Sequence, residues 1–535
     1  MDDSPEIRGA ETLKAASDEA LRHRWLGAGG AVALSLASGW AGALPVYHPL
    51  SHWFAPQSAQ TLAAAVVGYA GLIVLVTSWW RLGQLSASGS AVSPREMLVT
   101  LWWWAAPLAL GAPMFSRDVY SYVAQGAMAA RGWDVYAGGP SVLPGPISAG
   151  VDWLWRDTPA PYGPVFVWLA AQVLRVTGEH VFAALVGMRL LAVSGFALVV
   201  WAVRRLAAAA GVCEASALWL AVLNPLVLVH LVGGAHNDAV MLGLMLSGLV
   251  LARSGRLAWG AVLITLAMLV KVPAGFALLF LIPEQFGGRS GLLRRAAVVA
   301  TTSAATVVVA TWVLGYGYGW LSALSTPADS PGVLSLTADL GNVLGALVEP
   351  LGLAAPHTVE AATRLAGVAG ALIAMPFWLW RMPRLGPERA LGVALLTVVV
   401  LAPAVQPWYF LWGLLPIAVT APGGRARTRL AAGSIALVFV VFLRGQAPGA
   451  AYAACCFTGA AVALVTLYRF DPVAGSTWRL ALTHRRSISP PLPLPLLPPP
   501  PSRPGERDRY PSPSFLGSRR PTGYIRRLRR PARDA

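Results

Sequence analysis

Apolar residues recur along this chain in long runs, each followed by a short polar or proline-containing break. A helix needs about 20 apolar residues to cross the hydrocarbon core of a bilayer, and most of these runs approach that length. We therefore predict an all-α polytopic membrane protein with about 14 transmembrane helices, within a range of 12 to 14. The predicted spans lie near residues 25–44, 60–80, 97–113, 181–203, 213–232, 236–252, 257–270, 273–283, 294–314, 361–380, 388–402, 408–420, 428–443 and 450–468.

Composition agrees with this fold class, because 56% of the residues are hydrophobic and only 12% are charged. That is about half the charged fraction of a soluble domain. Of the net charge of +17, the segment from Pro472 onward supplies +10, from 13 arginines against three acidic residues. Three cysteines, all in or beside apolar runs, are too few for a disulfide framework. These features exclude cytosolic enzymes, secreted domains and nucleic-acid binders, and they leave membrane lipids as a partner.

The basic residues indicate how each predicted span is oriented across the membrane, because inner loops of membrane proteins carry an excess of Lys and Arg. With a cytoplasmic N-terminus and a re-entrant or interfacial half-helix at 164–176, 18 basic residues lie at inner ends and seven at outer ends. Both termini are then cytoplasmic in a plasma (inner) membrane protein. The predicted parts are a cytoplasmic tail (1–24), a multi-span domain (25–470) with outer loops at 114–163 and 315–360, and a disordered Pro/Arg-rich cytoplasmic tail (471–535).

The first polar cluster, from Ser116 to Tyr122, directly follows the third predicted span. A partly buried Asp at a membrane boundary can accept a proton from a hydroxyl group, so Asp118 is a candidate general base. The alternative is that Ser116 or Asp118 only caps an interfacial helix over 119–131.

A second cluster, His236-Asn237-Asp238, lies in a predicted outer turn between two apolar helices. These side chains are candidates for binding sugar hydroxyls or for contributing to a divalent cation site, although two ligands do not make a metal site alone. A glycine turn with a capping Asn or Asp is the alternative.

Lys271 and Arg189 are the candidate phosphate-binding residues. Lys271 is one of only two lysines in the chain and stands at a predicted helix break, where a compact ammonium group suits a phosphate oxygen. Arg189 lies about two turns inside a predicted span and must face the protein interior or a cavity. The alternative is an interhelical salt bridge, with Asp238 or Asp118 as the partner.

Aromatic residues mark two more breaks on the predicted outer face. Gln406, Trp408 and Tyr409 interrupt two spans, and Tyr162 follows Pro161 at the end of the long outer loop. Aromatic rings stack on sugars, but Trp and Tyr are equally common as anchors at the membrane interface.

Taken together, these motifs resemble the actinobacterial polyprenol-phosphomannose-dependent α-1,6-mannosyltransferases of the GT-C superfamily. The similarity covers about residues 25–470. One mild departure is Val135, where such enzymes have Pro, and no proposed catalytic atom is affected. The motifs that carry the resemblance are Ser116–Tyr122, Gln125-Gly126, Arg131-Gly132, Asp134-Val135-Tyr136, Trp155–Pro164, Asn224-Pro225, Gly233–Asp238, Lys271-Val272-Pro273 and Gln406–Tyr409.

The resemblance implies a GT-C fold and an inverting enzyme that moves mannose from polyprenyl phosphomannose to a lipid-anchored α-1,6-mannan of the lipomannan and lipoarabinomannan type. It assigns the catalytic carboxylate to Asp118, and Lys271 with Arg189 would neutralise the phosphate charge. It implies no certain cofactor, a divalent cation being one candidate. The implied substrate-binding residues are Arg117, Tyr120, Tyr162, Arg189, His236, Asn237, Asp238, Lys271, Gln406, Trp408 and Tyr409.

Other functions remain open on sequence alone. A related transferase could move arabinose or glucose from its polyprenyl phosphate, because no residue fixes the epimer. A transporter or lipid flippase is a second class, but its ionisable residues would lie near the membrane midplane, often within paired repeats. Here the polar residues gather at one predicted interface and the sequence shows no repeat.

Overall fold

The computed structural model describes residues 5–46, 59–87, 92–283, 288–329 and 335–440, together with Leu443 and Ala461. All regular secondary structure in these residues is helical and no strand forms among them, which confirms the all-α prediction. The predicted span at 450–468 and the predicted tail at 471–535 lie outside the described residues, apart from Ala461.

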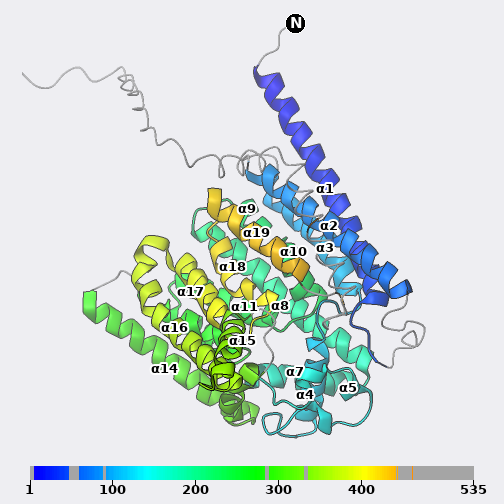
Figure 1. Cartoon of the computed structure of the whole chain (residues 1–535). Coiled ribbons are helices and arrows are strands. Elements are labelled where there is room, and N and C mark those ends of the chain that lie inside the picture. The colour runs from blue at the N-terminus through cyan, green and yellow to red at the C-terminus, as the bar shows by residue number, and fades with distance from the viewer. Residues whose placement is uncertain are drawn as a thin grey trace, which may run out of the picture. The chain divides into compact units, whose positions relative to one another are not determined.

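Three long helices open the chain and lie side by side (Figure 1). The first two approach closely, because Gly30 and Gly71 each face the backbone carbonyl of the other, where a Cβ atom would not fit. Small residues at helix crossings are typical of membrane proteins. These helices are α1 (Pro5–Ala41), α2 (Ala59–Ala87) and α3 (Pro94–Leu110).

The predicted first outer loop folds into short helices, and α4, α5 and α7 gather at one end of the long helices (Figure 1). The longest two, α4 and α7, pack on each other where Gly126 meets the carbonyl of Ala170. The loop contains α4 (Asp118–Ala130), η1 (Pro140–Val142), α5 (Pro146–Ala149), α6 (Trp153–Arg156) and α7 (Pro164–Thr177).

The middle of the chain forms a tightly packed set of helices in which α11 contacts both α8 and α12. Glycine makes both contacts close, because Gly243 faces the Gly195 carbonyl and Gly248 faces the Gly260 carbonyl. The segments are α8 (Val181–Ala209), α9 (Glu214–Ala221), α10 (Pro225–Val227), the π-helix η2 (Leu228–Gly233), α11 (Asp238–Arg253), α12 (Leu257–Met268), η3 (Val272–Gly275) and α13 (Phe276–Leu279).

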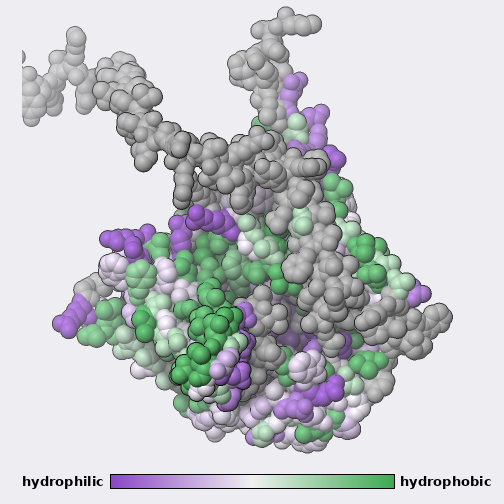
Figure 2. Space-filling model, in the orientation of Figure 1, coloured by the Kyte–Doolittle hydropathy of each residue, from purple (hydrophilic) through white to green (hydrophobic). Residues whose placement is uncertain are grey.

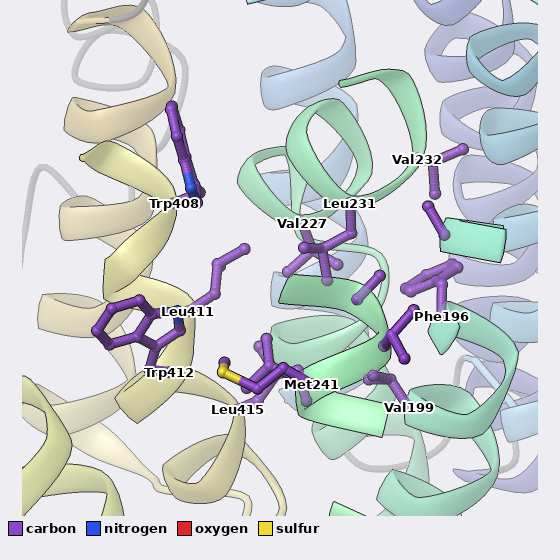
Figure 3. Packing of buried hydrophobic residues seen from close by; sticks show 14 of the residues in the cluster. Phe196, Val199, Val227, Leu231, Val232, Met241, Trp408, Leu411, Trp412 and Leu415 are labelled. Carbon is purple, nitrogen blue, oxygen red and sulfur yellow. The ribbon is translucent and has the colours of Figure 1, made fainter. Parts of the chain in front are cut away.

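The last described helices complete the core. Leu411 and Leu415 of α18 point toward Val227 of α10 and Met241 of α11 (Figure 3), and all belong to one buried apolar cluster. On the side away from α1 to α3 lie α14, α16 and α17 (Figure 1). This region comprises α14 (Gly288–Leu314), η4 (Gly319–Asp329), α15 (Leu336–Val348), η5 (Glu349–Leu351), α16 (Pro356–Leu385), α17 (Pro387–Leu401), η6 (Pro407–Tyr409), α18 (Phe410–Ala418) and α19 (Gly424–Val440).

Four described helices, α2, α8, α14 and α16, are long and apolar enough to cross a membrane, and the bent pair from Glu214 to Gly233 is a fifth candidate. Large apolar side chains are exposed on α14 and α16, and apolar areas are visible over this face of the molecule (Figure 2). The protein is therefore embedded in a membrane. The count of 14 spans and the GT-C fold stay predictions, because helices such as α12, with 12 residues, reach only about 18 Å.

Candidate active site

Four helix breaks meet to form a cluster of polar and aromatic side chains. Asp118 begins α4, His236 precedes α11, Lys271 follows α12, and Trp408 lies in η6 just before α18. Asp118 contacts His236, His236 stacks on Trp408, and Lys271 lies close enough to Asp118 to influence its charge. The prediction that these breaks share one face is thus consistent with the contacts.

Asp118 is the most accessible acidic group of the cluster. Its side chain is 18% exposed, and its Oδ2 lies 3.5 Å from Nδ1 of His236, which is fully buried. The first amide of α4, that of Asp118, donates to the Ser116 hydroxyl at 3.0 Å, and the N-cap residue Arg117 makes no side-chain capping hydrogen bond within the described residues. The cap alternative therefore applies to Ser116 and not to the Asp118 carboxylate.

Burial raises the pKa of Asp118 to about 6, and the nearby carboxylates of Asp238 and Asp152 act in the same direction. Lys271 and the hydrogen bond with Ser116 oppose this shift but do not cancel it. A carboxylate with a pKa near 6 is ionised at neutral pH and is a stronger base than an ordinary Asp. Asp118 is thus suited to accept a proton.

Lys271 and Asp238 form a buried ion pair, the alternative considered for Lys271. The ammonium Nζ donates to Oδ1 and Oδ2 of Asp238 at 3.1 and 2.9 Å, and it lies 4.4 Å from the centre of the Tyr409 ring. Trp412 Nε1 donates to the same carboxylate at 2.6 Å. The sequence reasoning missed Trp412, although its spacing of three residues from Tyr409 places both rings on one side of a helix.

Histidine and tryptophan rings form a second layer next to Asp118. The rings of His236 and Trp408 are stacked with centroids 4.0 Å apart, and His230 lies 5.0 Å from Trp408. In the part of the chain that the structure describes, both nitrogens of His230 are buried without a hydrogen-bond partner, as is Nε1 of Trp408. His230 was also missed, because it is a single His within an apolar run, and only its place in the π-helix η2 marks it.

Tyr122 and Tyr162 connect the predicted first outer loop to this cluster. The Tyr122 hydroxyl donates to Oδ1 of Asn237 at 3.4 Å, and its ring meets the edges of Tyr162 and Phe166. Nδ2 of Asn237 is buried and has no hydrogen-bond partner among the described residues. The contact between Tyr122 and Asn237 joins α4, which begins at Asp118, to the residue next to His236.

The break at Gly163 fixes the end of the predicted first outer loop against the Lys271 turn. The amides of Gly163 and Val165 donate to the carbonyls of Val270 and Leu269, at 3.3 and 3.1 Å. A Cβ atom on residue 163 would overlap the Leu269 carbonyl, so only glycine fits. This contact keeps Tyr162 next to the turn that carries Lys271.

Three predicted binding residues donate hydrogen bonds to backbone carbonyls. Arg117 Nε donates to the Gly150 carbonyl at 3.0 Å, and the Tyr120 hydroxyl donates to the carbonyl of Ala43. Both terminal nitrogens of Arg189 donate to backbone carbonyls as well. Gln406 is the partly exposed residue before η6.

The predicted divalent cation has two candidate ligands in the cluster. Asp118 and His236 are two adjacent groups able to bind a metal, but the described residues contain no group of three such side chains. We therefore derive no chemical step through a metal ion.

Two protein families match the chain in succession. Residues 24–285 match the family described as "Alpha-(1->6)-mannopyranosyltransferase, N-terminal domain", and residues 337–469 match the family described as "MptB C-terminal domain". The first match contains Asp118, His236 and Lys271, and the second contains Trp408 and Trp412.

Three named relatives align over most of the chain. It is 38% identical to "Alpha-(1->6)-mannopyranosyltransferase A" of Mycobacterium tuberculosis, over 78% of this chain and 83% of the relative. It is 35% identical to "Probable alpha-(1->6)-mannopyranosyltransferase" of Mycolicibacterium smegmatis, over 91% of both chains. It is 33% identical to "Alpha-(1->6)-mannopyranosyltransferase B" of Corynebacterium glutamicum, over 79% of this chain and 77% of the relative. No solved structure matches the chain.

Proposed function

This chain belongs to the alpha-(1->6)-mannopyranosyltransferase family and is a mannosyltransferase, and we propose that it transfers mannose from polyprenyl phosphomannose to an α-1,6-mannan acceptor on the outer face of the plasma membrane. The acceptor would be a lipid-anchored mannan of the lipomannan type. The observation that carries the proposal is the partly exposed Asp118, with its pKa raised to about 6, beside His236 and Lys271.

The proposed reaction is a single displacement with inversion. The 6-hydroxyl oxygen of the acceptor attacks the anomeric carbon of the donor mannose, and Asp118 accepts the hydroxyl proton. The bond from that carbon to the phosphate oxygen breaks, and polyprenyl phosphate leaves with the electron pair from the opposite side. A β-linked donor therefore gives an α-linked product. The spare hydrogen-bonding atoms of Asn237 and His236 support binding of sugar hydroxyls beside the base.

Lys271 is the residue we propose to bind the donor phosphate. Its ammonium group has three N–H bonds and directs two at Asp238, which leaves a third donor for a phosphate oxygen. The hydrogen bond from Trp412 holds Asp238 in place. Charge builds up on the phosphate as it leaves, so a fixed cation would stabilise the transition state more than the ground state.

An apolar groove beside the site supports a lipid-linked donor. The groove has a volume of about 540 Å³ and is lined by α7, α12 and α14. It includes Val165, three residues after Tyr162, and Leu266, five residues before Lys271. We propose that the polyprenyl chain of the donor occupies this groove, which would bring its phosphate to the Lys271 turn.

The experiment is a transfer assay on membranes that contain the native chain, Asp118→Asn or Asp157→Asn, at matched protein levels. The donor is radiolabelled polyprenyl phosphomannose and the acceptor is an α-1,6-mannoside. We expect Asp118→Asn to lose about 100-fold or more of the rate, as removal of a general base does. Asp157 is an exposed carboxylate in the same outer loop, and Asp157→Asn should keep native activity.

Two results would contradict the proposal. Full transfer by Asp118→Asn would remove Asp118 as the base. A native chain that transfers arabinose or glucose from the corresponding polyprenyl phosphate, but not mannose, would replace the proposed donor.

A further inference from the structure

Arg189 is a buried cation whose charge is balanced by carbonyl groups. It lies about two turns inside α8, a candidate membrane span, and is 8% exposed. Nη1 donates to the carbonyls of Leu108, Ala109 and Gly111 at 2.9, 2.8 and 2.9 Å. Nη2 donates to the carbonyl of Gly233 at 2.9 Å. Within the described residues, no carboxylate lies at salt-bridge distance from this guanidinium group.

The carbonyls bound by Nη1 lie at the carboxyl end of α3. The last carbonyls of a helix lack intrahelical partners and carry partial negative charge, so a cation there is stabilising. From Gly111 the chain runs seven residues to Asp118 and passes through Phe115, which has a φ of +62°. A bulky residue with positive φ is strained and keeps that conformation only when its surroundings enforce it.

The carbonyl bound by Nη2 belongs to the other half of the site. Gly233 ends η2, and three residues later comes His236. Ala235, between them, has a φ of +52°, which is a second strained non-glycine residue. A single guanidinium group therefore joins two strained segments, one leading to Asp118 and the other to His236.

We infer that Arg189 is a positioning residue for the Asp118–His236 pair, acting through the backbone of these two segments and not through contact with substrate. The inference rests on the proposed function, in which Asp118 is the base. Both terminal nitrogens donate to backbone carbonyls, and we assign the donor phosphate to Lys271.

Arginine suits this task because its guanidinium group is planar and offers five N–H donors in a fixed arrangement. A lysine at the same position would keep the charge but has three donors on one atom. It cannot donate hydrogen bonds to carbonyls on both segments with the same geometry. Arg189→Lys should therefore leave the protein charged and folded while loosening the spacing between Asp118 and His236.

The test compares Arg189→Lys and Arg189→Gln with the native enzyme in the transfer assay. We expect kcat per folded molecule to fall by about 10- to 100-fold in Arg189→Lys, because displacement of a catalytic group by about 1 Å has effects of this size. The KM for polyprenyl phosphomannose should stay near native. The acidic limb of the pH–rate profile should move, because the surroundings of Asp118 change. Arg189→Gln should show the same pattern more strongly.

The control is Arg205→Lys, which makes the same change at an exposed position on the same helix and should match the native enzyme. A raised donor KM with an unchanged kcat and pH limb would assign Arg189 to phosphate binding and overturn the inference. If the yield of folded protein falls while kcat and the acidic limb of the pH–rate profile stay native, Arg189 only stabilises the fold, and the inference is again overturned. Asp118→Asn separates the two proposals. If the Asp118→Asn enzyme keeps full activity, the proposed base is wrong. If it is inactive while Arg189→Lys behaves like the native enzyme, only the positioning role is contradicted.

Discussion

At the scale of single residues, the charge of Asp118 is set by neighbours that act in opposite directions. Burial, Asp238 and Asp152 raise its pKa to about 6, while Lys271 and the hydrogen bond with Ser116 lower it. His236 is the remaining titratable group in direct contact with the carboxylate. Because a general base must be deprotonated, the rate should fall as the pH drops below about 6.

We predict that two substitutions move the acidic limb of the pH–rate profile, where the rate falls below about pH 6, in opposite directions. Lys271→Met removes a positive charge that favours the carboxylate, so the limb should move to higher pH, together with a loss of rate. Asp152→Asn removes a negative charge and should move the limb to lower pH. Asn can still accept the hydrogen bond that Asp152 takes from the Leu154 amide at the start of α6. Single-turnover rates from pH 5 to 8 measure both shifts.

A limb that stays in place in both variants would show that a group other than Asp118 controls the rate. Asp157→Asn provides the reference, because this exposed carboxylate is not among the groups that shift the pKa of Asp118.

Most residues of the cluster could be predicted from the amino-acid sequence, but the groups that they contact could not. Asp118, His236 and Lys271 stand out as polar residues at the ends of apolar runs, and helix ends on one face of a membrane protein can meet. The targets of Arg189 could not be predicted, because they are backbone carbonyls from residues 78 to 81 and 44 positions away. A carbonyl is present at every residue, so the sequence gives no signal for such a contact.

At the scale of helices, the apolar runs predicted α2, α8, α11 and α14 to within a few residues at most ends. The second outer loop was less predictable. It contains η4 and α15, whereas the sequence predicted only an outer loop at 315–360. In α15 the small residues Gly341 and Gly345 are the ones that pack against α16, so the buried face carries little apolar signal.

The groove beside α14 yields a prediction about the donor lipid. Ala305 lines the groove, whereas the adjacent Ala304 does not. We expect Ala305→Trp to fill the groove and raise the KM for a long-chain polyprenyl phosphomannose by about tenfold. A donor with only two isoprene units, which needs little of the groove, should react almost normally. Ala304→Trp adds the same bulk to the same exposed stretch of α14 and should affect neither donor.

Equal effects of Ala305→Trp on the short and long donors would place the polyprenyl chain elsewhere. Loss of transfer from both donors in Ala304→Trp as well would mean that α14 does not tolerate the added volume, and Ala305→Val would then be compared with Ala304→Val on the same two donors.

At the scale of the whole molecule, three helices connect the site to an end of the membrane domain rich in arginine. α11 starts at Asp238 in the site and ends about 24 Å away at Arg253, which pairs with Glu388 at the start of α17. α12 returns to Lys271, and α17 leads back toward Trp408. The site residues and the arginine-rich helix ends are thus separated by the length of a helix. This separation agrees with the inner and outer ends predicted from the distribution of charge.

We predict that the site end faces outward, and cysteine labelling can test this in intact cells. Ser141 is exposed in the first outer loop, so Ser141→Cys should react with a membrane-impermeant maleimide. Cys213 is exposed at the start of α9, near the ion pair between Arg204 and Glu214, on the predicted inner face. It should react only after the membrane is permeabilised. Replacing Cys455 and Cys456 by Ser leaves these two thiols as the only ones. Labelling of Cys213 but not of Ser141→Cys in intact cells would invert the topology, and it would place the transfer reaction, with its donor and acceptor, on the cytoplasmic face.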